Sequence, residues 1–176
     1  MSSYKDSIAK AIIDGDASQE VIGCLRTPSL QLTSSAAWAL EQLSAHGVET
    51  TGPLVQQGAL QQLVDVVSSI PDIVECQPEL YLQLKSAIKS LVRGCDKADA
   101  LQSFVAQSTP PQLLKHLLRR LEPLLRDSPK ARQAFVTSGA LMRMQGVEGG
   151  LCDRGRGCLE SINALFPEDV VLYYRE

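Results

Sequence analysis

Apolar residues recur along this chain at helical spacing, in long stretches separated by shorter ones. Positions three and four apart share one face of an α-helix, so such a pattern predicts a helix with an apolar stripe. Similar stretches occupy residues 35–43, 84–92 and 158–165. The pattern therefore predicts an all-α protein. Its clearest stripe consists of leucines: Leu113, Leu114, Leu117, Leu118, Leu121, Leu124 and Leu125.

Prolines mark where these helices begin and end. Proline is favoured in the first turn of a helix, where its missing N–H has no intrahelical acceptor. Pro167 is expected to follow the end of the last long helix. Pro123 lies inside the third and should kink or split it, because it removes a backbone donor. The prolines expected to open the long helices are Pro28, Pro78 and Pro110-Pro111.

A repeated pattern underlies these helices. Three segments place Val or Ile before a glycine, and an apolar run follows each; the glycines are Gly15, Gly58 and Gly139. We expect each glycine where one helix ends and the next turns away, a place that favours positive φ. Corresponding long-helix positions recur on average every 41 or so residues, within the range of armadillo and HEAT repeats. A short helix, a medium helix and a long helix in each unit favour the armadillo layout. The corresponding positions are Leu40, Ile88, Leu118 and Ile162.

The predicted architecture is an armadillo-repeat, right-handed superhelical solenoid forming one domain, 1–176. It has about four units: 1–45, 46–94, 95–126 and 127–176. Each unit is too small to bury its own apolar stripe, so neighbouring units stack and share one core. The third unit is compressed, which predicts a shortened helix near Asp96–Ser108.

Composition agrees with closely packed helices. Hydrophobic residues make up 44% of the chain and aromatic residues only 5%, so the core is expected to be aliphatic. No apolar run reaches the roughly 18 residues that a membrane span needs, and the polar start predicts no secretory signal. Five scattered cysteines predict buried free thiols in a reducing, cytoplasmic or cytoskeletal setting rather than a disulfide framework.

Charge is distributed unevenly along the chain. Residues 1–84 carry 3 basic and 10 acidic side chains, whereas residues 85–156 carry 13 basic and 6 acidic ones. The net charge of −3 therefore hides a basic half of the molecule. Within it, Lys130 and Arg132 are expected on a solvent-exposed helix capped by Asp127 or Ser128.

Several segments carry a family resemblance. Residues 35–40 are similar to the last helix of armadillo repeats in general. More specifically, residues 110–116, 127–139 and 162–174 resemble the C-terminal part of the sperm-associated antigen 6 family, armadillo proteins of the axoneme central pair. The resemblance implies a non-catalytic scaffold of cilia and flagella that supports motility. The family carries further repeats upstream, so we expect self-association through the N-terminal unit, whose apolar end face would be exposed.

The long helix of each armadillo unit lines a concave groove. If Trp38 and Gln42 face it, the same register adds residues from two later helices, and the groove is basic in its middle. Acidic tubulin tails or other central-pair proteins are the expected partners. The alternative is a solvated helix face, and Trp38 is as readily a core residue as a binding one. The added positions are Ser86, Lys89, Ser90 and Arg93, then His116, Arg119 and Arg120.

Other functions find less support. An adaptor for cargo or signalling partners outside the axoneme remains the alternative, although Gln42 stands where nuclear-import adaptors have Asn. No nucleic-acid partner is expected, because the pI is 5.4 and no aromatics interleave with the basic residues. No enzyme or cofactor is expected, because His46 and His116 lie on different units without paired carboxylates.

Two further motifs lack residues that a ligand site would need. A zinc site from Cys152 and Cys158 lacks two further ligands nearby, so no metal is expected. The glycine-rich stretch at residues 146–157 lacks the Lys-Ser/Thr ending of a phosphate loop and does not follow a strand. We predict that it forms a flexible loop between helices.

Overall fold

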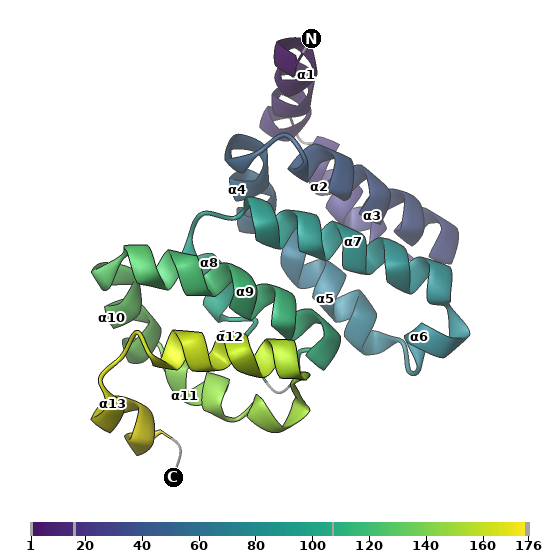
Figure 1. Ribbon diagram of the computed structural model, residues 1–176. Coiled ribbons are helices and arrows are strands. Elements are labelled where there is room, and N and C mark those ends of the chain that lie inside the picture. Colours follow the sequence, from purple (N-terminus) through teal and green to yellow (C-terminus); the bar gives the residue numbers. More distant parts are fainter. Residues whose placement is uncertain (1, 16, 107, 175–176) are drawn as a thin grey trace. The chain divides into compact units, whose positions relative to one another are not determined.

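A computed structural model describes residues 2–15, 17–106 and 108–174 of the protein (Figure 1). Every regular element in these ranges is a helix, which confirms the all-α prediction. The chain divides into two compact units, Met1–Cys95 and Asp96–Glu176.

Unit 1 is built on two long helices, α3 and α7. The hydroxyl of Ser29 caps α3 by accepting a 3.4 Å hydrogen bond from the Leu32 N–H, and Pro78 is the first residue of α7. Both starts follow from local sequence, because a side-chain acceptor and a proline each suit a helix N-terminus. The elements are α1 (Ser2–Asp14), α2 (Ala17–Cys24), α3 (Leu30–Ser44), α4 (Val48–Gln56), α5 (Ala59–Ser69), α6 (Ile73–Cys76) and α7 (Pro78–Gly94).

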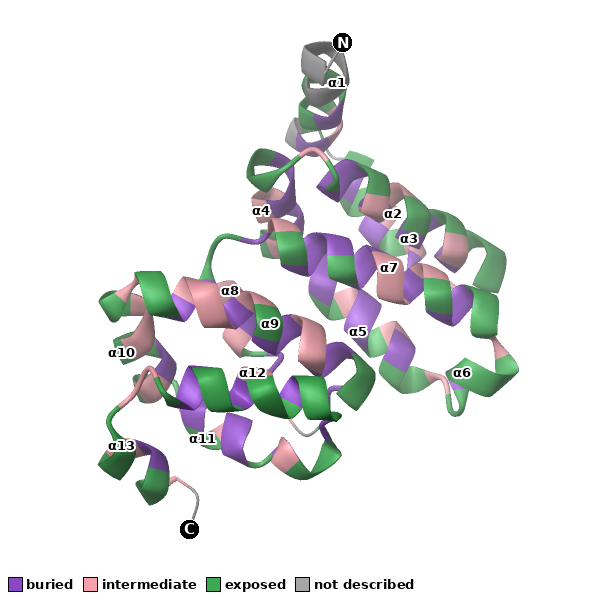
Figure 2. Ribbon diagram, viewed as in Figure 1, coloured by how far each residue is buried: buried purple, intermediate pink, exposed green. Residues whose placement is uncertain are grey.

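In unit 1 the two long helices pack against each other, and so do two of the shorter ones. The long helices α3 and α7 lie side by side and form the most extensive contact of the unit, while α1 packs against α4 (Figure 1). Aliphatic side chains fill the space between them; Leu40, Leu84 and Ile88 are fully buried. Figure 2 shows the buried positions along the inner sides of these helices. This pairing is the stacking by which helical repeats share a core.

Unit 2 follows the same scheme with different helix lengths. The long helix α9 packs extensively against α12, and α8 packs against α10 (Figure 1). Six α9 leucines of the predicted stripe are buried, and Leu124 is half-buried. The elements are α8 (Ala98–Gln102), α9 (Pro111–Asp127), α10 (Pro129–Thr137), α11 (Ala140–Gln145), the 3₁₀ turn η1 (Glu148–Gly150), α12 (Asp153–Asn163) and α13 (Glu168–Tyr173).

The shortened helix predicted near residues 96–108 is confirmed. Helix α8 has only five residues, and an irregular segment precedes α9. Phe104 and Val105 in this segment are buried, so the segment itself supplies core. The Thr109 hydroxyl donates a 2.7 Å hydrogen bond to the Phe104 carbonyl, and Arg143 of α11 donates to the Val105 carbonyl at 3.3 Å. These bonds satisfy buried carbonyls that a helix would otherwise have paired.

Pro123 was predicted to kink or split the third long helix, and the split does not occur. Helix α9 continues through Pro123 to Asp127. Its neighbours Leu121 and Leu125 are fully buried, and this packing holds the backbone helical across the missing donor.

The prediction for the start of α10 is right in one part and wrong in another. The Ser128 hydroxyl caps α10 by accepting a 3.1 Å bond from the Ala131 N–H, as expected. Arg132, however, does not simply project into solvent. Its guanidinium donates hydrogen bonds of 2.8 and 2.9 Å to the carbonyls of Leu125 and Arg126, at the end of α9. A cation there satisfies unpaired helix carbonyls.

Glycine positions were predicted with mixed success. Gly58 and Gly139 have φ of 89° and 70° between paired helices, as expected. Gly15 follows α1 without a positive φ. The glycine-rich stretch is not entirely loop, because α12 begins at Asp153 and includes Gly155. A Cβ on Gly155 would lie 3.1 Å from Leu151 Cδ2, so close packing explains this glycine.

Candidate partner-binding surfaces

The seam between α3 and α7 is polar and centres on Glu41. Its two carboxylate oxygens accept hydrogen bonds from Gln83 Nε2 at 2.8 Å and from Ser86 Oγ at 2.6 Å. Trp38, one turn before Glu41, is 56% exposed. The structure therefore excludes the interpretation of Trp38 as a core residue. Its ring borders a hollow of about 520 Å³ lined by Ser34, Ser35, Trp38, Ala39 and Gln83.

The remaining residues predicted for unit 1 flank this seam. Gln42 is exposed on α3, and Lys89 and Arg93 are exposed on α7, one and two turns after Ser86. Ser90 belongs elsewhere. It is 8% exposed and hydrogen bonds to Ser44, so the prediction that it faces the groove is wrong. Ser90 lies about 100° around the helix from Lys89, which turns it into the contact with α3.

The role of Glu41 was not predicted from the sequence. Its carboxylate, held by Gln83 and Ser86, adds a negative charge to the seam, so the surface of unit 1 is not uniformly basic. We call this surface, made of Trp38, Glu41, Gln42, Lys89 and Arg93, the Trp38 surface. Leu82, 62% exposed, adds an apolar position two turns before Lys89 on α7.

In unit 2 the predicted residues are all on α9 and share one side of it, because residues three and four apart lie on the same helix face. Arg119 is exposed, whereas His116 and Arg120 are half-buried. Whether these residues bind a partner remains a prediction.

Cys158, on α12, carries a half-buried thiol. Burial raises the pKa of the Cys158 thiol above its usual value; the Glu122 carboxylate raises it further, and the Arg119 and Arg154 guanidinium groups lower it. These three charged residues belong to α9 and α12, the two helices that pack most extensively in unit 2. We call the solvent-exposed part of these two helices the α9–α12 face. Arg154 and Cys158 were missed as members because only helix packing brings them beside α9.

Two acidic residues of α9 and α12 are paired. Arg126 forms an ion pair with Glu122 four residues before it, and Arg156 forms one with Asp153. Arg119 and Arg154 have no ion-pair partner within the described ranges. The α9–α12 face therefore presents positive charge to solvent.

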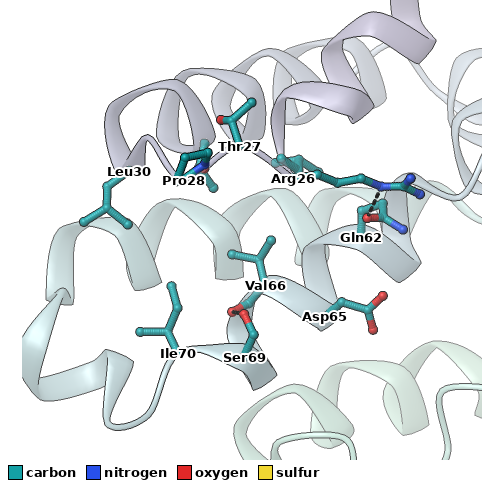
Figure 3. Close-up of a pocket in the computed structure, with 11 residues that line it drawn as sticks. Arg26, Thr27, Pro28, Leu30, Gln62, Asp65, Val66, Ser69 and Ile70 are labelled. Atoms are coloured by element: carbon teal, nitrogen blue, oxygen red, sulfur yellow. Dashed lines mark hydrogen bonds between the residues drawn. The ribbon is translucent and has the colours of Figure 1, made fainter.

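A different hollow lies on unit 1, between the α2–α3 turn and α5 (Figure 3). Its volume is about 350 Å³. Leu30, Val66 and Ile70 form an aliphatic end, while Arg26 donates a 2.8 Å hydrogen bond to Gln62 at the other end (Figure 3). This hollow has mixed polarity and no excess of one charge.

Chemically reactive groups do not gather at a site. Within residues 2–15, 17–106 and 108–174, no three His, Cys, Asp or Glu side chains are arranged to hold a metal ion. The expectation of buried thiols is wrong for Cys76 and Cys152, which are exposed, while Cys95 is buried. No helix in the described part of the chain is long and apolar enough to cross a bilayer.

An all-helical fold in which long helices stack on one another defines a protein of the α-helical repeat class. The chain is similar to Sperm-associated antigen 6 of Mus musculus, 33% identical over 84% of this chain. It is 31% identical to Sperm-associated antigen 6 of Homo sapiens over the same share. The resemblance to that family is thus confirmed and is consistent with a C-terminal portion. The chain spans 28% of the length of each relative.

Structural comparison supports the fold alone. A crystal structure of an engineered protein from the Northeast Structural Genomics Consortium matches with a TM-score of 0.54 at 18% identity. The match covers 91% of this chain and 66% of the other. No protein-family model matches the sequence.

Proposed function

We propose that this protein is a non-catalytic, protein-binding scaffold of the axonemal central-pair apparatus in cilia and flagella. The observation that carries the proposal is the similarity to Sperm-associated antigen 6 over 84% of the chain. Those relatives are sperm-associated by name, and the sperm flagellum is built on an axoneme. The cytoskeleton of the cilium or flagellum is the corresponding location.

The partners that fit the surfaces are proteins with acidic segments, such as tubulin tails or other central-pair proteins. Arg119 is exposed on α9, and Lys89 and Arg93 are exposed on α7. Complementary charge steers association and fixes the register of a partner more than it adds affinity. The binding should therefore weaken as salt rises.

Cosedimentation with polymerised tubulin tests this proposal. The protein should pellet with intact polymers and much less with polymers whose acidic tails have been removed by subtilisin. The double substitution Arg119→Glu and Arg120→Glu should reduce pelleting without unfolding the protein, because neither side chain is in the core. Equal pelleting with intact and tail-free polymers would exclude the tails as partner; failure to pellet with either would remove tubulin altogether.

An adaptor outside the axoneme is favoured by one observation, the exposure of Trp38 beside the 520 Å³ hollow. Exposed tryptophans are frequent anchors at protein interfaces. If Trp38→Ala abolishes capture of a partner while tubulin pelleting is unchanged, the adaptor hypothesis gains and the axonemal one loses support.

We also propose self-association through the N-terminal unit. Ile8 of α1 and Leu30 and Leu32 of α3 are large apolar residues, each more than 40% exposed. Light scattering over a dilution series should show a concentration-dependent dimer. The substitution Leu32→Lys should abolish it, whereas Leu172→Lys on α13, at a similarly exposed leucine, should not.

A further inference from the structure

We propose that the hollow between the α2–α3 turn and α5 binds the C-terminal residue of a partner protein, an aliphatic residue whose α-carboxylate is held by Arg26. The inference rests on the proposed protein-binding function and adds to it a second kind of partner contact, away from the exposed basic residues of α7 and α9. Every residue that lines this hollow lies between Leu25 and Ile70, so the site belongs to unit 1 alone (Figure 3).

Arg26 supplies a guanidinium group that is held in place but has free donors. Its Nε donates a 2.8 Å hydrogen bond to Gln62 Oε1, which fixes the direction of the side chain (Figure 3). Within the described ranges, neither Nη1 nor Nη2 of Arg26 has a hydrogen-bond or ion-pair partner. These two nitrogens form the fork that binds a carboxylate through two parallel hydrogen bonds. A ligand carboxylate can therefore bind here without breaking an ion pair.

The other end of the hollow is aliphatic. Leu30, Val66 and Ile70 line it, and Leu30 is 44% exposed at the start of α3 (Figure 3). An aliphatic side chain placed against them would remove apolar surface of both molecules from water, which favours association. The occupant therefore needs an aliphatic group close to a carboxylate.

Asp65 indicates the third group of the occupant. Its Oδ1 accepts a 2.7 Å hydrogen bond from Gln61 Nε2, and no described residue donates a hydrogen bond to Oδ2. A carboxylate in the wall favours an N–H donor and disfavours a second carboxylate. The last residue of a protein carries an N–H, a carboxylate and a side chain on one Cα. Asp65, Arg26 and the aliphatic end match these three groups in turn.

The size and exposure of the hollow favour the end of a chain over a free small molecule. Its volume of about 350 Å³ is near the lower limit for ligand pockets, which hold about 300–1,000 Å³, so it suits a short group. Pockets for free ligands bury most of the ligand surface, whereas Arg26, Leu30 and Asp65 are all exposed. An occupant here stays open to solvent on one side, where the rest of a partner chain would continue.

The test uses the whole isotope-labelled protein and a short glycine–serine peptide that ends in leucine with a free carboxylate. An NMR titration gives the Kd, and the Nε–H signal of Arg26 reports where the peptide binds. Amidation of the peptide C-terminus should weaken binding about tenfold, because it removes the charge that Arg26 holds. Replacing the terminal leucine by glycine should also weaken binding about tenfold, because the aliphatic contact is lost.

Two pairs of substitutions localise the binding. Arg26→Gln should weaken it about tenfold, whereas Arg93→Gln, the same charge change at another exposed arginine of unit 1, should leave Kd within about twofold. Leu30→Gln should weaken it about fivefold, whereas Leu32→Gln should not. These two leucines of α3 are 44% and 41% exposed, but of the two only Leu30 lines the hollow. Circular dichroism should show that all four variants remain folded, as expected for exposed positions.

Dependence on the free carboxylate, the terminal leucine, Arg26 and Leu30 together supports the site. Equal binding of the amidated peptide, equal losses within either pair of variants, or no binding by the unmodified protein overturns it. Tighter binding of free leucine than of the peptide would show an amino-acid site and overturn the chosen occupant. Tubulin cosedimentation tests the scaffold function independently, so that function can stand where this site fails.

Discussion

The hydroxyls of Ser44 and Ser90 lie 2.8 Å apart and are hydrogen bonded, although the residues are 46 positions apart in the sequence. Ser44 ends α3 and Ser90 lies in the last part of α7, so the bond ties the C-terminal ends of the two long helices together. Both residues are buried, at 3% and 8% exposed. A buried polar pair of this kind favours one register between the helices, because a shift would leave the Ser90 hydroxyl without this partner, while Ser44 keeps its 2.9 Å hydrogen bond to the Glu41 carbonyl.

Removing this bond should cost stability. Ser90→Ala is expected to lower the free energy of unfolding by about 1 kcal/mol, since it leaves the buried Ser44 hydroxyl with one partner fewer. Urea denaturation followed by circular dichroism measures the change. Ser86→Ala removes a hydroxyl from the more open Glu41 seam and should have a smaller effect. In a double-mutant cycle, Ser44→Ala and Ser90→Ala should be non-additive; strictly additive losses would contradict a direct bond.

Gly94 is required by the close approach of α4. A Cβ at this position would lie 2.3 Å from Thr51 Oγ1, and Thr51 is fully buried with its hydroxyl bonded to the Ser44 and Gly47 carbonyls. Gly94→Ala should therefore lower the free energy of unfolding by about 1–3 kcal/mol through overpacking. Differential scanning calorimetry would show the lowered Tm.

A matched control for Gly94 lies in α2. A Cβ on the exposed Gly23 meets nothing within 4 Å, so Gly23→Ala should stabilise the protein by up to about 1 kcal/mol through helix propensity. If both substitutions stabilise the protein, the tight contact between Gly94 and Thr51 is not present in solution.

Trp38 provides a direct optical test, because it is the one tryptophan in the sequence. At 56% exposed, it should emit at the long wavelength typical of a hydrated indole and be quenched efficiently by acrylamide. Trp38→Ala should change stability by no more than about 0.5 kcal/mol, as at other surface positions. Blue-shifted emission from the free protein would show that the side chain is buried.

Cys158 should react slowly with thiol reagents, and its rate should depend on its charged neighbours. The thiolate is the reactive form, and burial raises the thiol pKa, so less thiolate is present at any given pH. Iodoacetamide labelling followed by mass spectrometry should therefore modify the exposed Cys76 and Cys152 first. The rate at Cys158 should still be rising with pH above pH 8.5, the ordinary thiol pKa.

The charged neighbours of Cys158 predict whether two substitutions speed or slow its labelling. Glu122→Gln removes a charge that raises the pKa of Cys158, so labelling at a fixed pH should become faster. Arg119→Gln removes a charge that lowers this pKa, so labelling should become slower. Opposite shifts would confirm that α9 and α12 present these groups to one another; no change in either variant would place Cys158 away from α9.

Helices and many of their boundaries could be predicted from the sequence because they depend on local geometry. Pro78 and Pro111 open helices, Ser128 caps one, and Gly58 and Gly139 supply the positive φ between pairs. Each of these effects acts within a few residues. The apolar spacing of α9 likewise follows from helix periodicity alone.

Pro123 shows where local rules were insufficient. Its missing donor favours a break, but the fully buried leucines on either side keep α9 continuous, and burial of this kind outweighs one lost hydrogen bond. The positive φ predicted for Gly15 is not observed, since a glycine at a helix end permits positive φ without requiring it.

The sequence by itself determined the helical class, most helix limits, the basic half and the family resemblance. Only the tertiary structure decided which surface residues meet. The hydrogen bonds of Glu41 to Gln83 and Ser86 and the burial of Ser90 against Ser44 both depend on which sides of α3 and α7 pack together. Helix periodicity gives each residue an angle on its own helix, but the angle between partners is set by side-chain packing across the contact.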